Sequence, residues 1–567
     1  MKVNNEKGIA LIFTLLLVIV LLSISVVFIL RTVQESNIAR KERDMMKAFY
    51  LAEAGGQAGL DGLNTLINNF MLNTVNGMNP STVINLAQTS LSNGLKLLES
   101  TVLDGGSQAI TLNASETEAT FQIAGVGLGD GNYSYDITIT EKSNPVIVTP
   151  DTWDFPYDYL IQLTSNLNTE SKEVVLRGDF TVRVQRDNFA KYALFTNSQT
   201  MPNGSYVWFT DKTNFAGPIH TNGRYNIALN PSGTFDGVVA QHSEYARYYN
   251  NGWSVLLNDD HNGTNDVPTF NAGFNRDVDT ITLSSAVDQQ DMEDQATSGT
   301  SFGSDGIYTP NNGSSLTGGI YVRGDSQVIL NITADDKPQY TIIQGGTTKN
   351  ITLDKANNQT TVETVGVGSI TYSGLPDGSD DVGTIIYVDG RIQNFQGTVQ
   401  SQEKLTVASD DDILVKGHVK YADYDPGSGS PGDGGYIPPN ANGAENLLGI
   451  VSWNGDVRVA TSAPDDINIH ASILARNGIL QVDNYNDQGV GPRGEATILG
   501  GVISDNYGAF GQFSGSTGQQ LSGYGRNFVY DQRMQTGTAP PYFPTLNTFI
   551  AFTNDITDKM VWQENGS

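Results

Sequence analysis

Acidic side chains gathered in short polar loops are the residues of this 567-residue chain best suited to bind a ligand. The stretch LNDDHNGTND brings Asp259, Asp260, Asn262 and Asp266 together, and their oxygen atoms are hard ligands of the kind that calcium takes. Further acidic groups occur at 377–381 and 410–412. None of these loops has the D-x-[DN]-x-[DN]-G spacing, so a solvated acidic turn is the alternative for each. We predict that Asp259, Asp260, Asn262 and Asp266 form a calcium loop, with calcium the one cofactor considered.

Catalytic motifs are missing from the sequence. The five histidines lie outside any HExxH pattern, and neither a GxSxG elbow nor a phosphate-binding loop occurs. The chain has no cysteine, which removes disulfides, thiolate metal sites and cysteine nucleophiles together. We therefore predict that the protein is not an enzyme and that His220, His418 and His470 face solvent or satisfy turns. A membrane-tethered carbohydrate-active enzyme is an alternative, since paired carboxylates can hydrolyse glycosides.

The composition indicates an acidic body rich in β-structure. The net charge is −29, so the clustered Lys and Arg that binding to nucleic acid requires are not expected. Charged residues make up only 16%, and 61 glycines punctuate the chain. The length allows several domains with sizeable cores.

The N-terminal segment MKVNNEKGIALIFTLLL joins a short charged leader to a long apolar run. Residues 9–30 carry no charge and would span roughly 30 Å as a helix, the thickness of a bilayer core. We predict a leader at 1–8, a transmembrane helix at 9–30 and an amphipathic continuation at 31–75. With the leader in the cytoplasm, the acidic body lies outside it. Basic residues flank both ends of the run, so charge alone fixes the orientation weakly.

This N-terminus resembles the class III signal of type IV pilins and pseudopilins, and AFYLAEAG at 48–55 is similar to the end of the PilX-like minor pilin N-terminus. The resemblance implies that a prepilin peptidase cuts after Gly8 and methylates the new N-terminus at Ile9. It also implies other pilins as partners through the helix. Phe13 stands at the fifth mature position, where most pilins carry Glu, and this departure favours a tip or initiating subunit. A simple signal anchor, in which Gly8 has no role, is the alternative.

Small residues are closely spaced between Ala48 and Gly59. They predict either a kink near Gly55 or close packing against another element, with a locally weak helix as the alternative. From about residue 100 apolar and polar residues alternate, as in half-buried antiparallel strands. We predict a small pilin-like β head at 76–188, against which the helix lies.

A glycine-centred phrase recurs through the rest of the chain, around Gly223, Gly324, Gly390, Gly417, Gly455, Gly478 and Gly501. Its last intervals are 27, 38, 23 and 23 residues, which favours the stacked coils of a β-solenoid. The predicted fold class is therefore α+β to mainly β, with a right-handed β-solenoid body. The predicted domains are a first part of the body at 189–375, solenoid-like coils at 376–545 and a tail at 546–567. A β-sandwich with long hairpins is the alternative, since 66 residues separate Gly324 from Gly390.

The stretches GPIHTNG (217–223), DDILVKGHVKYAD (411–423) and YDQRM with PPYFP (530–544) resemble a bacterial domain of unknown function found behind PilX-like N-termini. That resemblance covers 190–545 and implies no activity. Together these observations predict a structural or adhesive minor pilin or pseudopilin of a type IV pilus or related secretion system. It would lie in the cytoplasmic membrane and, after assembly, at the cell surface or pilus tip. A stand-alone anchored protein that binds surface polysaccharide is the alternative.

Overall fold

The computed structural model describes residues 5–68, 75, 80–89, 111–112, 118–149, 151–168, 170–210, 213–227, 233–250, 253–258, 268–283, 286–422, 424, 444–514, 519–553, 556 and 561–564. The chain divides into two compact units. Unit 1 comprises 1–185 and 549–567, and unit 2 comprises 186–548. The chain is a long apolar helix followed by a large body rich in β-strands, which confirms the predicted fold class at this level. The finer domain boundaries stay predictions.

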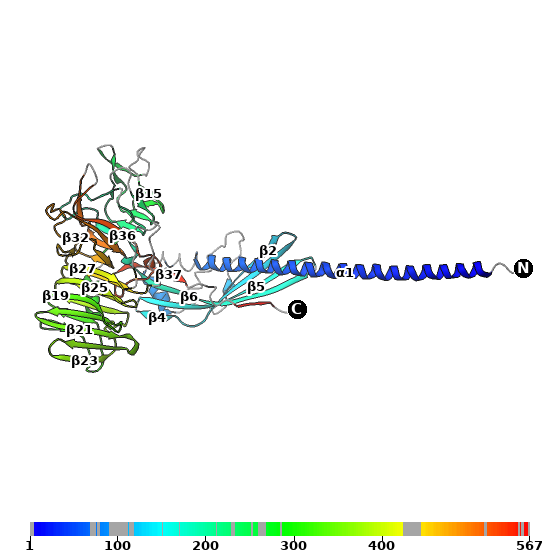
Figure 1. Cartoon of the computed structure of the whole chain (residues 1–567), viewed down its shortest axis with the longest axis horizontal. Helices are drawn as coiled ribbons and strands as arrows, with labels where there is room; N and C mark the ends of the chain where they lie inside the picture. The colour runs from blue at the N-terminus through cyan, green and yellow to red at the C-terminus, as the bar shows by residue number, and fades with distance from the viewer. Residues whose placement is uncertain are drawn as a thin grey trace. The chain divides into compact units, whose positions relative to one another are not determined.

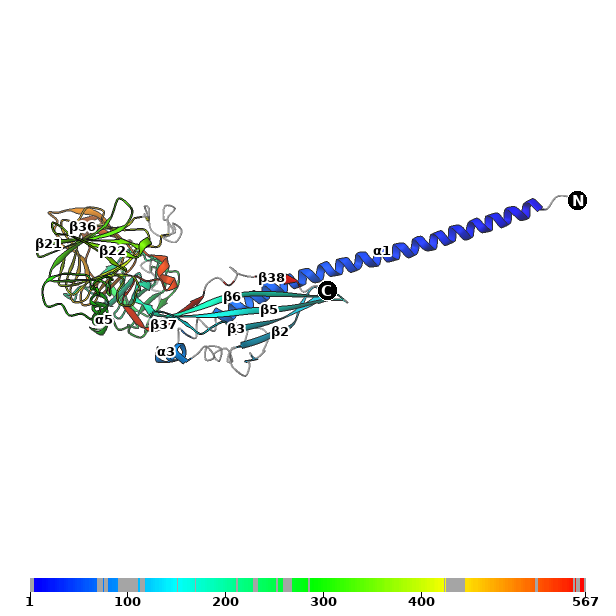
Figure 2. The ribbon, with the colours of Figure 1, turned by 90° about the horizontal axis from the view of Figure 1, so that it is seen from below.

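Unit 1 begins with one unbroken helix, α1 (Asn5–Leu66) (Figure 1). Its second half lies along an antiparallel sheet of long strands (Figure 2). The sheet has the order β1-β2-β3-β5-β6-β37, with β4 paired to β5 and β38 paired to β6. A short helix, α3 (Pro80–Thr89), belongs to the same unit. The strands are β1 (Thr111–Leu112), β2 (Glu118–Leu128), β3 (Gly131–Glu141), β4 (Val146–Thr149), β5 (Thr152–Leu167), β6 (Glu170–Asn188), β37 (Thr545–Thr553) and β38 (Val561–Glu564).

Side-chain alternation explains how this sheet packs. Along β5 buried side chains alternate with more exposed ones, so that Tyr157, Tyr159, Ile161 and Leu163 all lie on one buried face. This face meets the helix residues Leu60 and Leu63 in one hydrophobic core. The C-terminal residues, named a tail from the sequence, return to this sheet as β38 and as the end of β37.

The small residues of α1 allow the helix to approach the sheet closely. A Cβ atom added to Gly59 would lie 2.8 Å from Ile161 Cγ2, and one added to Gly55 would lie 2.5 Å from Leu163 Cδ2. Nearby, the buried Ser165 hydroxyl donates a 2.7 Å hydrogen bond to the carbonyl of Ala48. Of the two outcomes predicted for this segment, close packing is therefore observed, and the helix continues past Gly55.

Unit 2 contains one sheet of eleven strands among its described residues, in the order β16-β12-β9-β7-β34-β31-β28-β26-β24-β18-β17. Every neighbouring pair in it is parallel except β17 with β18. The strands are β7 (Leu194–Ser198), β9 (Ile219–Thr221), β12 (Val239–Gln241), β16 (Phe274–Asn275), β17 (Gly306–Tyr308), β18 (Ile320–Arg323), β24 (Thr384–Asp389), β26 (Lys404–Ser409), β28 (Leu447–Ser452), β31 (Ser472–Ala475) and β34 (Val502–Asn506).

After most of these strands, the next strand in the sequence belongs to a second sheet. Its parallel part runs β19, β25, β27, β30, β33 and β36, and β29 and β32 pair beside it. An antiparallel meander, β20 to β23, extends this sheet beyond β19 (Figure 1). The strands are β19 (Ser326–Ile332), β20 (Pro338–Gln344), β21 (Thr347–Asp354), β22 (Gln359–Thr364), β23 (Gly368–Ser373), β25 (Ile392–Val399), β27 (Ile413–Tyr421), β29 (Val457–Val459), β30 (Asn468–His470), β32 (Leu480–Val482), β33 (Pro492–Leu499), β35 (Gly511–Phe513) and β36 (Gln520–Val529).

Smaller elements complete unit 2. A sheet with the order β14-β13-β10-β8 and a pair β11-β15 belong to its N-terminal part, and α5 packs on β18 and β24. These elements are β8 (Trp208–Phe209), β10 (Asn226–Ile227), β11 (Thr234–Phe235), β13 (Ala246–Asn250), β14 (Trp253–Leu257), β15 (Thr269–Phe270) and α5 (Ala286–Thr297). Three 3₁₀ turns are η3 (Phe189–Lys191), η4 (Lys355–Asn357) and η6 (Gln532–Thr536).

The order of strands in the eleven-stranded sheet departs from the order of the chain. The chain passes from β7 through β9 and β12 to β16, and after α5 it re-enters the sheet at β17 and β18. It then advances through β24, β26, β28 and β31 to β34, which pairs with β7. The last pass through this sheet therefore lies directly beside the first.

One row of aliphatic side chains crosses this sheet through the register of its strands. Each member faces the next across a strand pair, and all are buried: Ile320, Ile386, Val407, Ile450, Ile473, Val502, Leu194, Ile219 and Val239. Parallel strands covered on both faces favour such apolar runs.

Amide side chains form a ladder at one end of the strands of the same sheet and in the turns that follow them. Asn477 donates to Asn454, which donates to Asp410, with distances of 2.9 and 2.8 Å. Asn222 donates to Asn197, which donates to Asp505, at 3.0 and 2.9 Å. The second series joins residues of the first passes to a residue of β34.

We predict that a larger side chain at Gly59 separates α1 from the sheet. Gly59→Leu improves helix propensity, but the added atoms overlap Ile161, and such overpacking costs about 1–3 kcal/mol. The expected result is a lower thermal midpoint for unit 1 of the detergent-solubilised chain, followed by circular dichroism. The control is Gly127→Leu, since a Cβ at the exposed Gly127 meets nothing within 4 Å. Equal midpoints for both variants would contradict the packing described.

We predict that Gly501→Ala opens the pairing between β34 and β7. The added Cβ would overlap the backbone carbonyl of Tyr192, which no side-chain movement relieves. Hydrogen exchange should accelerate roughly tenfold for amides of 194–198 and 502–506, because overpacking costs about 1–3 kcal/mol. Gly303→Ala is the control, as its Cβ has open space. Unchanged protection in Gly501→Ala would rule out the pairing.

Candidate functional site: the N-terminal helix

The first half of α1 is apolar and exposed along its whole length. From Ile9 to Leu30 every large hydrophobic side chain is exposed, including Phe13 at 73%. Among the described residues this is one helix that is long and apolar enough to cross a membrane. Exposing this much apolar surface to water would be costly, so a lipid or protein environment must cover it.

The few polar side chains in the apolar run are satisfied inside the helix. Thr14 Oγ1 donates to the carbonyl of Ala10, and Ser23 and Ser25 donate to the carbonyls of Ile19 and Leu21, each at 2.8 Å. A hydroxyl bonded to the carbonyl one turn earlier leaves no donor facing hydrocarbon. The run therefore meets the requirement that a bilayer places on polar groups.

Gly8 and Ile9, predicted as the processing site, lie at the start of this helix. Both are exposed, and a Cβ added to Gly8 would meet nothing within 4 Å. Glycine destabilises a helix by about 1 kcal/mol relative to Ala, and terminal turns fray readily. The Gly8–Ile9 peptide bond is thus accessible, and the first turn can unwind at low cost.

The charged stretch after the apolar run stays exposed. Lys41 lies 3.9 Å from Glu170, and Arg43 lies 3.6 Å from Asp44, with both basic side chains about two-thirds exposed. Exposed pairs of this kind contribute little to stability. This part of α1 is therefore available for contacts beyond the chain itself.

The residues of the predicted calcium loop, Asp259, Asp260, Asn262 and Asp266, lie outside the described residues. Within the described part of the chain no group of three or more His, Asp or Glu side chains could hold a metal ion. Asp412 contacts Arg391 and Arg458 at 3.4 and 3.2 Å. Asp380 accepts a 2.8 Å hydrogen bond from Gln295. These two acids have protein partners in place of a cation.

The prediction that the histidines face solvent was wrong for two of them, although His220 bonds Asn222 in the turn after β9, at 3.0 Å. His220 is buried and stacks on Phe195, with ring centroids 5.2 Å apart. His470 is buried and accepts a 3.1 Å hydrogen bond from the amide of Tyr421. Burial lowers the pKa of His220, so the ring is neutral at pH 7. The adjacent Ile219 and Ile469 are buried as well, so both faces of these short strands are covered at these positions.

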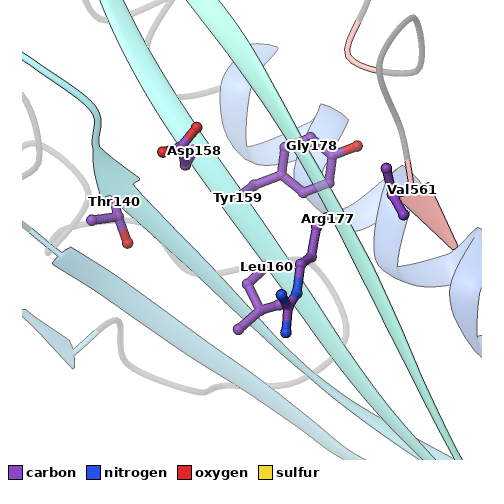
Figure 3. Close-up of a pocket in the computed structure, with 7 residues that line it drawn as sticks. All are labelled: Thr140, Asp158, Tyr159, Leu160, Arg177, Gly178 and Val561. Carbon is purple, nitrogen blue, oxygen red and sulfur yellow. The ribbon is translucent and has the colours of Figure 1, made fainter. Parts of the chain in front are cut away.

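A shallow cavity of about 420 Å³ lies on the sheet of unit 1 (Figure 3). Its walls include Thr140, Asp158, Leu160 and Arg177 from three adjacent strands. These side chains lie on the face opposite Tyr159 and Ile161, which pack toward the helix core. Nearby, Lys142 contacts both Asp158 and Asp179, at 3.5 and 3.2 Å. Paired charges on an open sheet face do not form an acid–base or nucleophilic arrangement.

The comparisons with known proteins are sparse. Residues 154–243 match the family described as a domain of unknown function (DUF4900), a range that starts before the expected 190–545 and covers only its first part. No curated protein matches the chain. One solved structure, the competence-associated pilin ComZ from Thermus thermophilus, aligns at 12% identity over 92% of this chain and 98% of that one, with a TM-score of 0.26. A likeness this weak establishes neither fold nor function.

We predict that a charge at the centre of the apolar run weakens membrane retention. Ile19→Lys places an ammonium group in hydrocarbon, which costs about 2.5–3.5 kcal/mol. Flotation of the full chain with lipid vesicles should show less of this variant in the lipid fraction than of the unmodified chain. Asn37→Lys, at an exposed site beyond the run, is the control and should float normally. An unmodified chain that stays soluble without lipid or detergent would contradict the prediction.

Proposed function

We propose that this protein is a membrane-anchored minor pilin or pseudopilin, inserted by the first half of α1 and carrying its body outside the cytoplasm. The observation that carries the proposal is α1 itself. One unbroken helix presents a fully exposed apolar half, while its other half packs on an antiparallel sheet through Gly55 and Gly59. A plain anchor needs only the apolar part. A helix rigidly continued into a folded head suits subunits that pack side by side through their helices.

The body is proposed to be a β-solenoid. Successive passes of the chain pair in parallel in both large sheets, and the aliphatic row and the amide ladder repeat from pass to pass. Such repetition is expected of stacked coils. The alternative, a sandwich, is built from antiparallel hairpins and Greek-key connections. In the described part of unit 2, antiparallel pairs occur from β19 through the β20 to β23 meander and in β13 with β14, β17 with β18 and β35 with β36.

A position at the tip of a filament, or an initiating role, follows from Phe13 and from the size of unit 2. A subunit without a carboxylate at that position lacks the group thought to meet a neighbour's terminal amine, so it gains less from insertion between other subunits. A head this large is also hard to repeat along a thin shaft. The proposed partners are other pilins, a prepilin peptidase and the membrane. A stand-alone anchored protein that binds polysaccharide is the second candidate. The exposed aromatic side chains Tyr206 and Tyr249 of unit 2 favour it.

We predict that the mature protein begins with N-methylated Ile9. Mass spectrometry of the N-terminal peptide from the native organism tests this, with Gly8→Leu as a variant that should stay uncut. Ile12→Leu is the control, because it changes the apolar run but leaves the Gly8–Ile9 bond intact. An intact Met1 on the membrane-bound protein would refute processing and leave the signal anchor.

A further inference from the structure

An exposed aromatic surface lies on the small sheet β14-β13-β10-β8 of unit 2. The register divides its side chains between two faces. Phe209, Ile227 and Tyr248 are buried and aligned with one another across β8, β10 and β13. The residues beside them in sequence therefore point the other way, toward solvent.

The outward side chains form what we call the aromatic patch, defined by Tyr206, Trp208, Arg224, Arg247, Tyr249 and Leu256. Trp208 and Arg247 both align with Asn226, and Leu256 aligns with Arg247. Asn226 itself is buried, and its amide donates to the carbonyls of Gln199 and Val207, both at 3.4 Å. Tyr206 is 52% exposed, and Tyr249 and Leu256 are exposed as well.

The three rings of the patch contact one another. Trp208 meets Tyr206 and Tyr249 edge to face, with ring centroids 6.5 and 6.2 Å apart. Edge-to-face packing holds ring faces at fixed angles to each other. The three rings are therefore joined through Trp208, and Tyr206 and Tyr249 are exposed to solvent.

Two arginines add positive charge to this surface. The guanidinium of Arg247 lies over the ring of Tyr206, 4.0 Å from its centroid. Its hydrogen bond and charge, with a smaller effect of Arg224, hold the pKa of Tyr206 below its usual value. Among the described residues no carboxylate lies within ion-pair distance of Arg224 or Arg247. A guanidinium has five N–H donors, so Arg247 can bond Tyr206 and still present N–H groups that fit a carboxylate with two hydrogen bonds.

We propose that the aromatic patch binds an acidic polysaccharide, whose sugar rings stack on Tyr206, Trp208 and Tyr249 and whose carboxylates pair with Arg247 and Arg224. Aromatic rings lie here beside guanidinium groups that have no carboxylate partner among the described residues. This combination suits a ligand in which the apolar faces of sugar rings alternate with carboxylates. Nucleic acid would also stack, but its affinity depends on many phosphate contacts, and the patch offers only two arginines. This site goes beyond the proposed function, since it does not depend on cleavage after Gly8.

Affinity electrophoresis of the full chain in detergent tests the proposal. Polygalacturonate and alginate are the acidic probes, dextran is the neutral probe, and a single-stranded oligodeoxynucleotide is the nucleic-acid probe. The acidic probes should retard the chain, and added salt should weaken the effect because exposed charges are screened. Tyr206→Ala and Arg247→Gln should each weaken binding roughly tenfold or more, as truncation of aromatic and Arg contacts does at interfaces.

Matched variants separate the site from general effects. Phe513→Ala removes an exposed aromatic ring elsewhere in unit 2 and should bind normally. Arg247→Lys keeps the charge but loses the planar edge, so intermediate affinity is expected. Tyr206 is half exposed, so its truncation leaves the core intact, and a circular dichroism spectrum verifies this. Absence of binding to both acidic probes, equal binding by Tyr206→Ala and Arg247→Gln, or stronger retardation by dextran or the oligonucleotide would each overturn the proposal. None of these results would bear on the proposed cleavage after Gly8.

Discussion

Unit 2 depends on one row of aliphatic side chains that runs from Ile320 to Val239 across the eleven-stranded sheet. Each short strand contributes one member, and several of these strands have only three or four residues. A strand that short cannot be stable alone. Its position is fixed because its aliphatic side chain packs between those of the neighbouring passes, and a shift of one residue would turn that side chain to the other face.

The same register explains the buried polar residues of this sheet and the pairing of β34 with β7. Two positions after the aliphatic row lies a second row that includes Ser409, Ser452, Ser504, Thr196, Thr221 and Gln241, all buried. Thr196 Oγ1 donates to Thr221 Oγ1 at 2.9 Å, whereas Ser409 and Ser452 donate to the carbonyls of Gly390 and Asp411 at 2.6 and 3.0 Å. Both rows pass without interruption from β34 to β7. The first and last passes therefore act as neighbouring strands although roughly 300 residues separate them.

The sequence predicted local features well and long-range order poorly. The apolar run and its helical continuation follow from residue type and spacing, whereas at Gly55 the small residues left a kink, close packing and a weak helix open. The recurring glycines are visible in the sequence, but the structural requirement for glycine differs from one position to another. Gly324 has positive φ, whereas a Cβ at Gly455 or Gly501 would collide with the backbone of an adjacent pass. The pairing of β34 with β7 cannot be predicted from the spacing of the glycines. That spacing gives only the number of residues between consecutive passes of the chain.

Parallel register also determines what the surface can recognise. When consecutive passes align, every outward position is repeated at one level, so side chains from distant segments form a row without any local motif. Trp208, Asn226 and Arg247 are such a row, opposite the core row of Phe209, Ile227 and Tyr248, and the antiparallel strand β14 adds Leu256 and Val255 to the two rows. In the sequence these aromatic residues are indistinguishable from residues that pack strands. Their exposure and the two arginines beside them become apparent only once the register is known, because no local motif joins residues from three separate segments.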